Sequence, residues 1–306
     1  MEVANPKHEH KGGDCMKPAP FSYYTPTSVR EAVTMLDEFG DHGRVLAGGQ
    51  SLFQLMNFRA VKPENLIDIN PVTELDYIRE GNGALAIGAR TRQSTLERSR
   101  EAVERAPLIV EAVENVAHPS VRNRGTVGGS VAYADPASEL PAVVLAMDGE
   151  VVLTSARGQR SLAAEDFFQG PYANACSADE LLAEVRLPEW PSGTGHAFLE
   201  FQRKHGSYAL MGTAVLVHLD GDSVDRVAIS LCGVDETPVR AFQAEDIVDG
   251  NVPTDEVFEE AAEAAVPELN PLPDPKGSPE YRRKLAKVFI RRALALAVRR
   301  AKGESS

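Results

Sequence analysis

The stretch that decides the fold is RNRGTVGGS, residues 122–130. It places three glycines and two small hydroxyl residues, Thr126 and Ser130, behind an arginine-rich lead-in. Because glycine carries no side chain, backbone N–H groups can turn toward a ligand, and the hydroxyls add further donors. Successive main-chain amides can wrap a diphosphate. The stretch therefore predicts an anion-binding loop.

A second glycine loop lies upstream in AGGQS, residues 47–51. It follows RVLA, residues 44–47, which reads as a short buried strand, and Ser51 can cap a short helix after it. Strand, glycine turn and helix N-terminus in this order form an anion site. A lone Gly-Gly pair is usually only a turn. Two such loops together predict one extended, phosphate-containing ligand held at two places.

Length, charge and cysteine content narrow the protein class. A chain of 306 residues corresponds to about two domains. Its formal net charge of −13 lacks the basic footprint of a nucleic-acid binder. Cys15, Cys176 and Cys232 are far apart, which excludes a local zinc ribbon and argues against an iron–sulfur cluster bound by this chain alone. With no apolar run for a membrane span and no signal-peptide pattern, we expect a cytoplasmic protein.

Composition also predicts where the chain divides. Residues 1–15 are polar, and a disordered tail is favoured there over a metal site at His8 and His10. Met16 is expected to begin the folded part, and we hypothesise that it is the initiator. The breaker-rich segment PEWPSGTG, residues 188–195, predicts a boundary between residues 16–192 and 193–306.

Periodicity and capping signals predict the main elements. A helix over residues 29–39 begins at a capping box, Ser28 and Glu31, and ends at Gly40. Residues 166–168 are expected in a loop. Further helices are predicted at 91–104, 107–116, 257–266 and 279–300, with a helix or strand at 141–147. Strands are predicted at 65–69, 84–89, 150–154, 181–187, 197–203, 213–219 and 226–232.

No self-sufficient catalytic motif is present. The G-x-G-x-x-G, P-loop, G-x-S-x-G and H-E-x-x-H patterns are all missing, as expected if a cofactor carries the chemistry. His118 is favoured as a helix-end or loop residue. Asp135, Ser138 and Glu139 either hydrogen-bond a ribose or cap a helix at Leu140. The basic face of residues 279–300 favours a packing helix over a nucleic-acid site, and a partner contact stays open.

These pieces together resemble the FAD-binding medium subunit of molybdenum-containing hydroxylases, the family of carbon monoxide dehydrogenase medium subunits and xanthine dehydrogenase flavin domains. The resemblance covers residues 16–300 and rests on FSY (21–23), AGGQSL (47–52), LIDI (66–69), RNRGTVGGS (122–130), ADPASELP (134–141) and YRR (281–283). It implies an α+β chain. A two-subdomain FAD-binding fold of the vanillyl-alcohol-oxidase (PCMH) type, with subdomains of about 16–70 and 71–192, precedes a C-terminal domain with a three-stranded antiparallel sheet and helices.

The resemblance also implies the cofactor contacts. Residues 46–52 and 126–130 would hold the FAD diphosphate, Glu139 would lie near the adenosine half, Leu182 would pack at the flavin side, and Tyr208 near the isoalloxazine ring. The full implied set is Leu46, Ala47, Gly48, Gly49, Gln50, Ser51, Leu52, Val116, Thr126, Val127, Gly128, Gly129, Ser130, Glu139, Leu182, Lys204 and Tyr208.

The chain departs from the family pattern in two places. Family members often carry a lysine near the flavin in the strand matching residues 198–202, where this chain has Glu200 and Gln202, and Asp is frequent at the position of Ser207. Arg203 and Lys204 follow that strand closely. These departures affect the contacts that set the reduction potential of the flavin and the choice of electron acceptor.

The function implied is electron transfer within a complex, so this chain is expected to be part of an oxidoreductase. FAD here would receive electrons from [2Fe-2S] clusters in a small subunit and pass them to quinone, oxygen or NAD. Substrate would be oxidised at molybdopterin in a large subunit, the assembly being a dimer of heterotrimers. Catalytic residues and metal ligands are not expected in this chain. Two alternatives stay open, a stand-alone flavin oxidase or reductase and a non-catalytic assembly subunit that has lost FAD.

Overall fold

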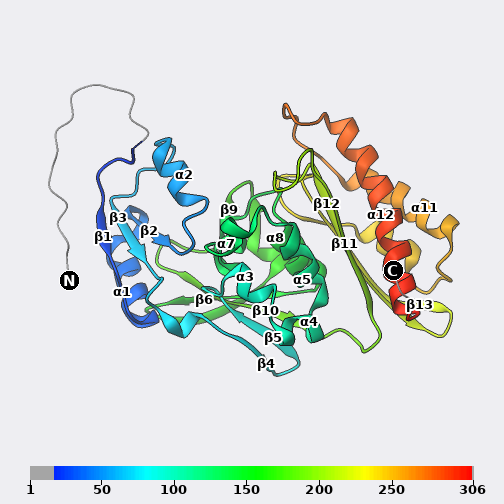
Figure 1. Cartoon of the computed structure of the whole chain (residues 1–306), viewed down its shortest axis with the longest axis horizontal. Coiled ribbons are helices and arrows are strands. Elements are labelled where there is room, and N and C mark those ends of the chain that lie inside the picture. Colours follow the sequence, from blue (N-terminus) through cyan, green and yellow to red (C-terminus); the bar gives the residue numbers. More distant parts are fainter. Residues whose placement is uncertain (1–16, 305–306) are drawn as a thin grey trace.

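The computed structural model describes residues 17–304 (Figure 1). The predicted disordered extension, residues 1–15, and the predicted start at Met16 lie outside the described residues. The described chain forms three sheets of three or more strands, which follow one another along the long axis from the N-terminal to the C-terminal part (Figure 1). Within residues 17–304, no helix combines the length and apolar character needed to cross a membrane.

The first sheet is small and parallel. Its strands β1 (Ser22–Tyr24), β3 (Asn65–Asp68) and β2 (Gly43–Leu46) lie in that order. Helix α1 (Val29–Phe39) covers it through Ala32, Val33 and Leu36, and Gly40 ends the helix at a φ of 48°. Only half of the predicted capping box forms, because the Glu31 carboxylate accepts from the Thr27 amide instead of the Ser28 amide. Helix α2 (Leu52–Asn57) follows the first glycine loop.

The second sheet is antiparallel and forms the centre of the molecule (Figure 1). Its order is β4 (Ile78–Gly81), β5 (Ala84–Gly88), β10 (Leu181–Pro188), β6 (Glu150–Ser155) and β7 (Gly158–Ala163). A two-stranded ribbon, β8 (Phe168–Gly170) with β9 (Ala173–Asn174), lies beside it. The helices of this part are α3 (Gln93–Leu96), α4 (Arg100–Arg105), α5 (Pro107–Asn115), α6 (Pro119–Arg122), α7 (Val127–Tyr133), α8 (Glu139–Ala146) and α9 (Ala164–Phe167).

Two predictions in this part are wrong. The single helix predicted at 91–104 is two helices, because Ser99 stops the first and caps α4 by accepting the Ala102 amide at 3.2 Å. The loop predicted at 166–168 is the end of α9 followed by the start of β8. Phe167 is fully buried there, so the aromatic side chain anchors regular structure that its polar neighbours concealed. Short 3-10 turns lie at Gly40–His42, Thr73–Leu75 and Val266–Glu268.

The C-terminal sheet is antiparallel and has helices on both faces. Its three long strands, β11 (Gly195–Phe201), β12 (Met211–Asp220) and β13 (Ser223–Cys232), match the prediction, and a two-residue edge strand β14 (Val239–Arg240) extends it to four. Helices α10 (Phe242–Val248), α11 (Asp255–Ala265) and α12 (Pro279–Ala301) belong to this part. Helix α12 lies on one side of the sheet, and α5 and α8 lie on the other (Figure 1).

Alternation along these strands divides the apolar residues between two cores. Ala197 and Val215 face the core shared with α12, whereas Phe198 and Ala214 belong to the central core with α5 and α8. Four of the eight basic side chains of α12 form ion pairs with described residues, namely Arg282, Lys287, Arg291 and Arg300. Lys287 and Arg291, for example, contact Glu259 on α11. This arrangement supports the interpretation of α12 as a packing helix.

Candidate functional site

The two glycine loops touch each other at the end of the first sheet. A Cβ atom added at Gly48 would lie 2.5 Å from the Arg124 carbonyl oxygen and 2.9 Å from the Gly125 Cα. These distances leave no space for a side chain. Residues more than 70 positions apart in the sequence are thus brought into backbone contact, as a ligand held at both loops requires.

The first loop presents a run of unused amides. Within the described residues, no hydrogen bond uses the backbone N–H groups of residues 48–52. Ser51 stands at the N-cap position of α2 but makes no capping bond, contrary to the capping predicted for it, because its φ and ψ of −99° and −48° are already helical. Gly49 has a φ of 75°, a conformation that favours glycine. Five successive donors without partners are suited to an anion with several oxygens.

The second loop differs in its backbone donors. The amides of Val127 and Gly128 donate to the carbonyls of Thr91 and Ala89, both at 2.9 Å. The Gly129 amide donates to Thr126 Oγ1 at 3.1 Å, and the Ser130 amide to the Thr126 carbonyl at 3.1 Å. Helix α7 and the neighbouring strand end already use the amides of residues 127–130, and the binding of the anion by residues 126–130 stays a prediction. The hydroxyls of Thr126 and Ser130 are further donors in this loop.

The polar residues after this loop are held by one another. Ser138 Oγ lies 3.0 Å from Ser130 Oγ and makes no capping bond, although Ser138 is the N-cap residue of α8. Asp135 accepts the Ala137 amide at 3.0 Å, and burial raises the pKa of its carboxyl. The helix begins at Glu139, one residue before the predicted Leu140. Contacts with Ser130 and within the turn therefore take the place of helix capping.

Glu139 and Glu200 form a buried acidic pair between α8 and β11. Burial raises the pKa of Glu139 to about 7, and burial with repulsion from Glu139 raises the pKa of Glu200 to about 9. Neither carboxylate oxygen of Glu200 has a hydrogen-bond partner within the described residues. The buried Cys232 lies on the same sheet face, across Gly212 from Glu200. The strand in which the family resemblance implies a lysine thus holds instead a carboxyl group whose pKa is raised by burial.

Three tyrosines gather beside Asp135. The ring centroids of Tyr133 and Tyr172 are 5.1 Å apart, and Tyr208 is 52% exposed with Lys276 Nζ 5.0 Å from its ring centre. Burial raises the pKa of Tyr208, with smaller contributions from Asp135 and Tyr172. The predicted flavin neighbour Tyr208 is therefore an accessible aromatic surface near the acidic residues that follow the second loop.

The other residues predicted to contact the cofactor have fewer links to the glycine loops. Leu182 is 5% exposed on β10 and belongs to the same apolar core as Val127 of α7. Val116 follows α5, and its carbonyl accepts from Arg122 Nη1 at 3.1 Å. Lys204 lies between β11 and β12, and no contact within residues 17–304 joins it to either glycine loop. His118 is the N-cap residue of α6, as its favoured interpretation predicted.

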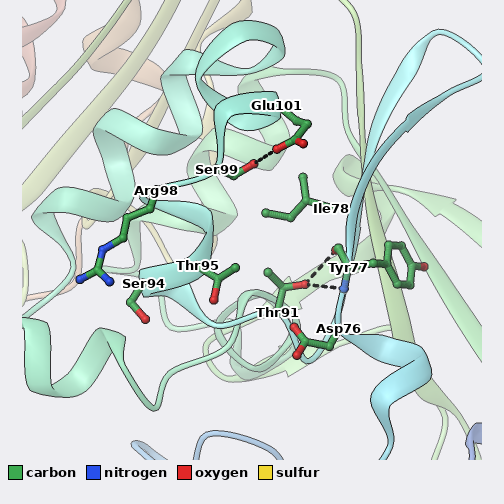
Figure 2. Close-up of a pocket in the computed structure, with 9 residues that line it drawn as sticks. All are labelled: Asp76, Tyr77, Ile78, Thr91, Ser94, Thr95, Arg98, Ser99 and Glu101. Carbon is green, nitrogen blue, oxygen red and sulfur yellow. Dashed lines mark hydrogen bonds between the residues drawn. The ribbon is translucent and has the colours of Figure 1, made fainter.

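One cavity lies apart from the glycine loops. Its volume is about 580 Å³, and Figure 2 shows the nine residues that line it, none of them from the glycine loops. Two of its hydroxyls are already engaged, since Thr91 Oγ1 bonds the Tyr77 backbone and Ser99 Oγ donates to Glu101 at 2.8 Å. The Tyr77 ring points away from this space (Figure 2). The cavity therefore lies between β4 and the helices α3 and α4. Because no residue of the glycine loops lines it, we do not assign it to the cofactor.

Two residues of the loop region were missed in the sequence. Asn70 and Arg92 bind the carbonyls behind the glycine loops. Asn70 comes directly after the strand over residues 65–69, and polar residues at strand ends are a usable signal for sites. Nothing in the sequence around Arg92 distinguishes it from Arg90 or Arg98.

Known proteins resemble the chain over nearly its whole length. Residues 19–190 match the family described as FAD binding domain in molybdopterin dehydrogenase, and residues 196–297 match the CO dehydrogenase flavoprotein C-terminal domain. Subunit alpha of the 6-hydroxypseudooxynicotine dehydrogenase complex of Paenarthrobacter nicotinovorans is 40% identical, over 94% of this chain and 97% of its own. The carbon monoxide dehydrogenase medium chain of Hydrogenophaga pseudoflava is 37% identical, over 92% and 98%.

A solved structure shows the same fold. A chain of the Hydrogenophaga pseudoflava carbon monoxide dehydrogenase, in a form that lacks the Mo-pyranopterin moiety of the molybdenum cofactor, has a TM-score of 0.91 at 38% identity. The match covers 92% of this chain and 99% of that chain. The predicted fold class and family are thereby confirmed, as is the oxidoreductase class, and FAD agrees with the family description. The domain limits and the individual cofactor contacts stay predictions. The chain belongs to the FAD-binding family of the molybdopterin dehydrogenases, with the flavoprotein C-terminal domain of CO dehydrogenases.

Proposed function

We propose that this chain is the FAD-carrying electron-transfer subunit of a molybdenum hydroxylase complex. It would pass electrons from iron–sulfur clusters of a partner subunit to an external acceptor. The observation that carries the proposal is the contact between the two glycine loops, one of which presents five unused amides. A dinucleotide with a diphosphate at its centre matches such a surface.

The residues present fit FAD. Amides of residues 48–52 would bind the diphosphate, with Leu46 and Ala47 leading into the loop and the Thr126 and Ser130 hydroxyls opposite. Gly48 lets the two loops touch, because a Cβ there would collide with the Arg124 carbonyl, and a Cβ at Gly129 would collide with Thr126 Oγ1. Tyr208 and Leu182 would lie toward the ring system, Glu139 toward the adenosine half, and Val116 and Lys204 are the remaining candidates. Bound flavin supplies the redox chemistry, and the protein positions it and excludes competing reactions.

The raised pKa of Glu200 bears on what this chain does around the flavin. A protonated Glu200 can donate a hydrogen bond, whereas a lysine in the same place would bring a positive charge. A cation favours the reduced, anionic form of a nearby group more than a neutral donor does. We therefore expect the Glu200 and Gln202 departures to lower the flavin potential relative to relatives with lysine.

The partners follow from the kind of relatives found. Proteins 37–40% identical to this chain are named as a complex subunit and as a medium chain, which supports a multi-subunit assembly. We propose a small [2Fe-2S] subunit, a large molybdopterin subunit and a dimer of heterotrimers in the cytoplasm. The acceptor would be quinone, oxygen or NAD, and the large subunit would select the substrate.

Co-expression of this chain with the proposed small and large subunits tests this function. The purified complex should be yellow, release FAD on denaturation, and hold molybdenum and iron in the other chains. Adding substrate should bleach the flavin absorbance only when all three subunits are present. Bleaching and turnover by the isolated chain would instead support a stand-alone flavin enzyme. A colourless chain within a complete complex would support an assembly subunit and contradict both flavin functions.

A further inference from the structure

A side-chain network joins the two glycine loops from behind. The Asn70 Nδ2 atom donates to the Ala47 carbonyl at 2.8 Å, in the first loop. Its Oδ1 atom accepts from Arg92 Nη2, and Arg92 Nη1 donates to the Arg124 carbonyl, in the second loop. One amide and one guanidinium therefore connect two segments whose backbones are in contact at Gly48.

The network fixes the direction of a loop peptide. The Ala47 carbonyl and the Gly48 N–H belong to one planar trans peptide group, so they point in opposite directions. With the carbonyl held by Asn70, the Gly48 N–H faces away from the network, where no described residue accepts it. The Arg124–Gly125 peptide is held at both ends, since the Gly125 amide donates to the Val121 carbonyl at 2.7 Å.

Asn70 is itself held in place. The buried Asp68 accepts the Asn70 backbone amide at 2.9 Å and also an Nδ2 hydrogen through the same oxygen. The other Asp68 oxygen accepts from the Tyr23 hydroxyl. Burial and the Asp68 carboxylate raise the pKa of Tyr23 to about 12, which keeps this donor protonated. The amide of Asn70 thus has both hydrogens and its oxygen assigned, and its orientation is determined.

The network also places positive charge behind the loops. Arg92 has no carboxylate within ion-pair distance among the described residues, and both its hydrogen-bond partners are neutral oxygens. Burial lowers its pKa, and repulsion from Arg124 and Arg90 adds to this, but an arginine stays charged. Asp76 and Asp68 lie near enough to favour the charged form of Arg92 without pairing with it, so a guanidinium with no direct ion pair stands beside the free amides, where it favours an anion.

We propose that Arg92 and Asn70 are positioning residues that hold the two glycine loops at one spacing and aim the Gly48 amide at the diphosphate of the bound dinucleotide. The proposal rests on the proposed function, because it concerns how FAD is bound. Neither side chain needs to touch FAD. Each acts through a loop carbonyl, and the guanidinium fork is required because it reaches two oxygens at once.

Binding measurements on the full chain test the proposal. The apo chain is titrated with FAD and followed by flavin fluorescence. Arg92→Gln loses one or both bridging contacts and the charge, and should raise the Kd for FAD about 10–100-fold. Arg92→Lys keeps the positive charge but loses the two-pronged guanidinium, and should still raise the Kd for FAD about tenfold. Asn70→Asp keeps the shape but replaces the donor to Ala47 with an acceptor, and should weaken binding at least about tenfold.

A control variant and two smaller probes separate positioning from general damage. Arg98→Gln removes an exposed arginine without an ion pair among the described residues, so its Kd should equal the wild-type value. ADP, which contains the diphosphate, should lose affinity by the same factor as FAD in Arg92→Gln. AMP, which lacks the diphosphate, should not. Thermal unfolding without ligand should show that each variant is folded.

The outcomes distinguish the two proposals. If wild-type chain binds FAD while folded Arg92→Gln and Asn70→Asp bind it within twofold of wild type, the positioning role is overturned. A wild-type Kd for FAD in Arg92→Lys would also overturn the positioning role, since the positive charge alone would then be enough for binding. If Arg92→Gln does not fold, Arg92→Lys and Asn70→Asp decide. If the wild-type chain binds no FAD at all, the proposed function fails and this inference fails with it.

Discussion

At the scale of single residues, Gly48 has no room for even one methyl group. In Gly48→Ala the new Cβ would lie 2.5 Å from the Arg124 carbonyl oxygen, so the loops must separate. We expect FAD affinity to fall at least about tenfold and the free energy of unfolding to fall by about 1–3 kcal/mol. FAD titration and urea unfolding measure both. Gly81→Ala is the matched control, because nothing lies within 4 Å of its Cβ position. Unchanged FAD affinity in Gly48→Ala would contradict the close contact.

Glu200 gives a pH-dependent prediction at the same scale. Its pKa is raised from 4.5 to about 9, so the stability that its neutral form contributes is complete below pH 4.5 and is lost as pH rises toward 9. Glu200→Gln cannot ionise, so its Tm should be close to wild type at pH 5 and clearly higher at pH 9. The titratable groups facing this position are Glu139 from α8 and Cys232 from β13. The exposed Glu260→Gln is the control. Equal Tm differences at both pH values would contradict a neutral Glu200.

At the scale of elements, a buried arginine adds polar contacts to the apolar packing between helix α12 and its sheet. Arg282 is 5% exposed and donates to the carbonyls of Leu210 and Gly233 and to Asp274. Arg282→Ala would leave these acceptors without partners, and we expect a loss of about 2–5 kcal/mol in the free energy of unfolding. Urea denaturation measures the loss. Arg299→Ala, an exposed arginine on the same helix, should change it by less than about 0.5 kcal/mol. Similar effects of the two substitutions would rule out the anchoring role.

Elements also differ in how far the sequence predicts them. The helix at Val29–Phe39 and the three long C-terminal strands follow from capping and alternation, because local periodicity is strong there. The break before α4 was missed, because the apolar residues on either side continue a helical pattern that hides the capping role of Ser99. The edge strand β14 has two residues and depends on pairing with β13.

At the scale of the whole molecule, the C-terminal sheet contributes to two cores. Phe198, Ala214, Leu216 and Ala228 complete the central core, while the opposite face packs on α12. An ion pair also links the central and C-terminal parts of the chain, since Arg300 Nη1 on α12 lies 2.9 Å from Glu111 Oε2 on α5. Because removing either part would expose an apolar face, we expect the apo chain to unfold in a single calorimetric transition with equal calorimetric and van't Hoff enthalpies. Two resolved transitions would mean that residues 17–192 and 193–304 are stable independently.

The family, the two glycine loops, the helix at Val29–Phe39 and the long C-terminal strands could be predicted from the sequence, because they depend on local composition and on motifs read along the chain. How the loops work depends on contacts between distant parts of the chain. The tertiary structure assigned the free amides to residues 48–52 and used those of residues 127–130 internally, since the acceptors are the carbonyls of Ala89, Thr91 and Thr126. It likewise brought Asn70 and Arg92 behind the loops and buried Glu139 against Glu200. Hydrogen-bond partners and neighbouring charges far apart in the chain set these properties, and no local pattern records them.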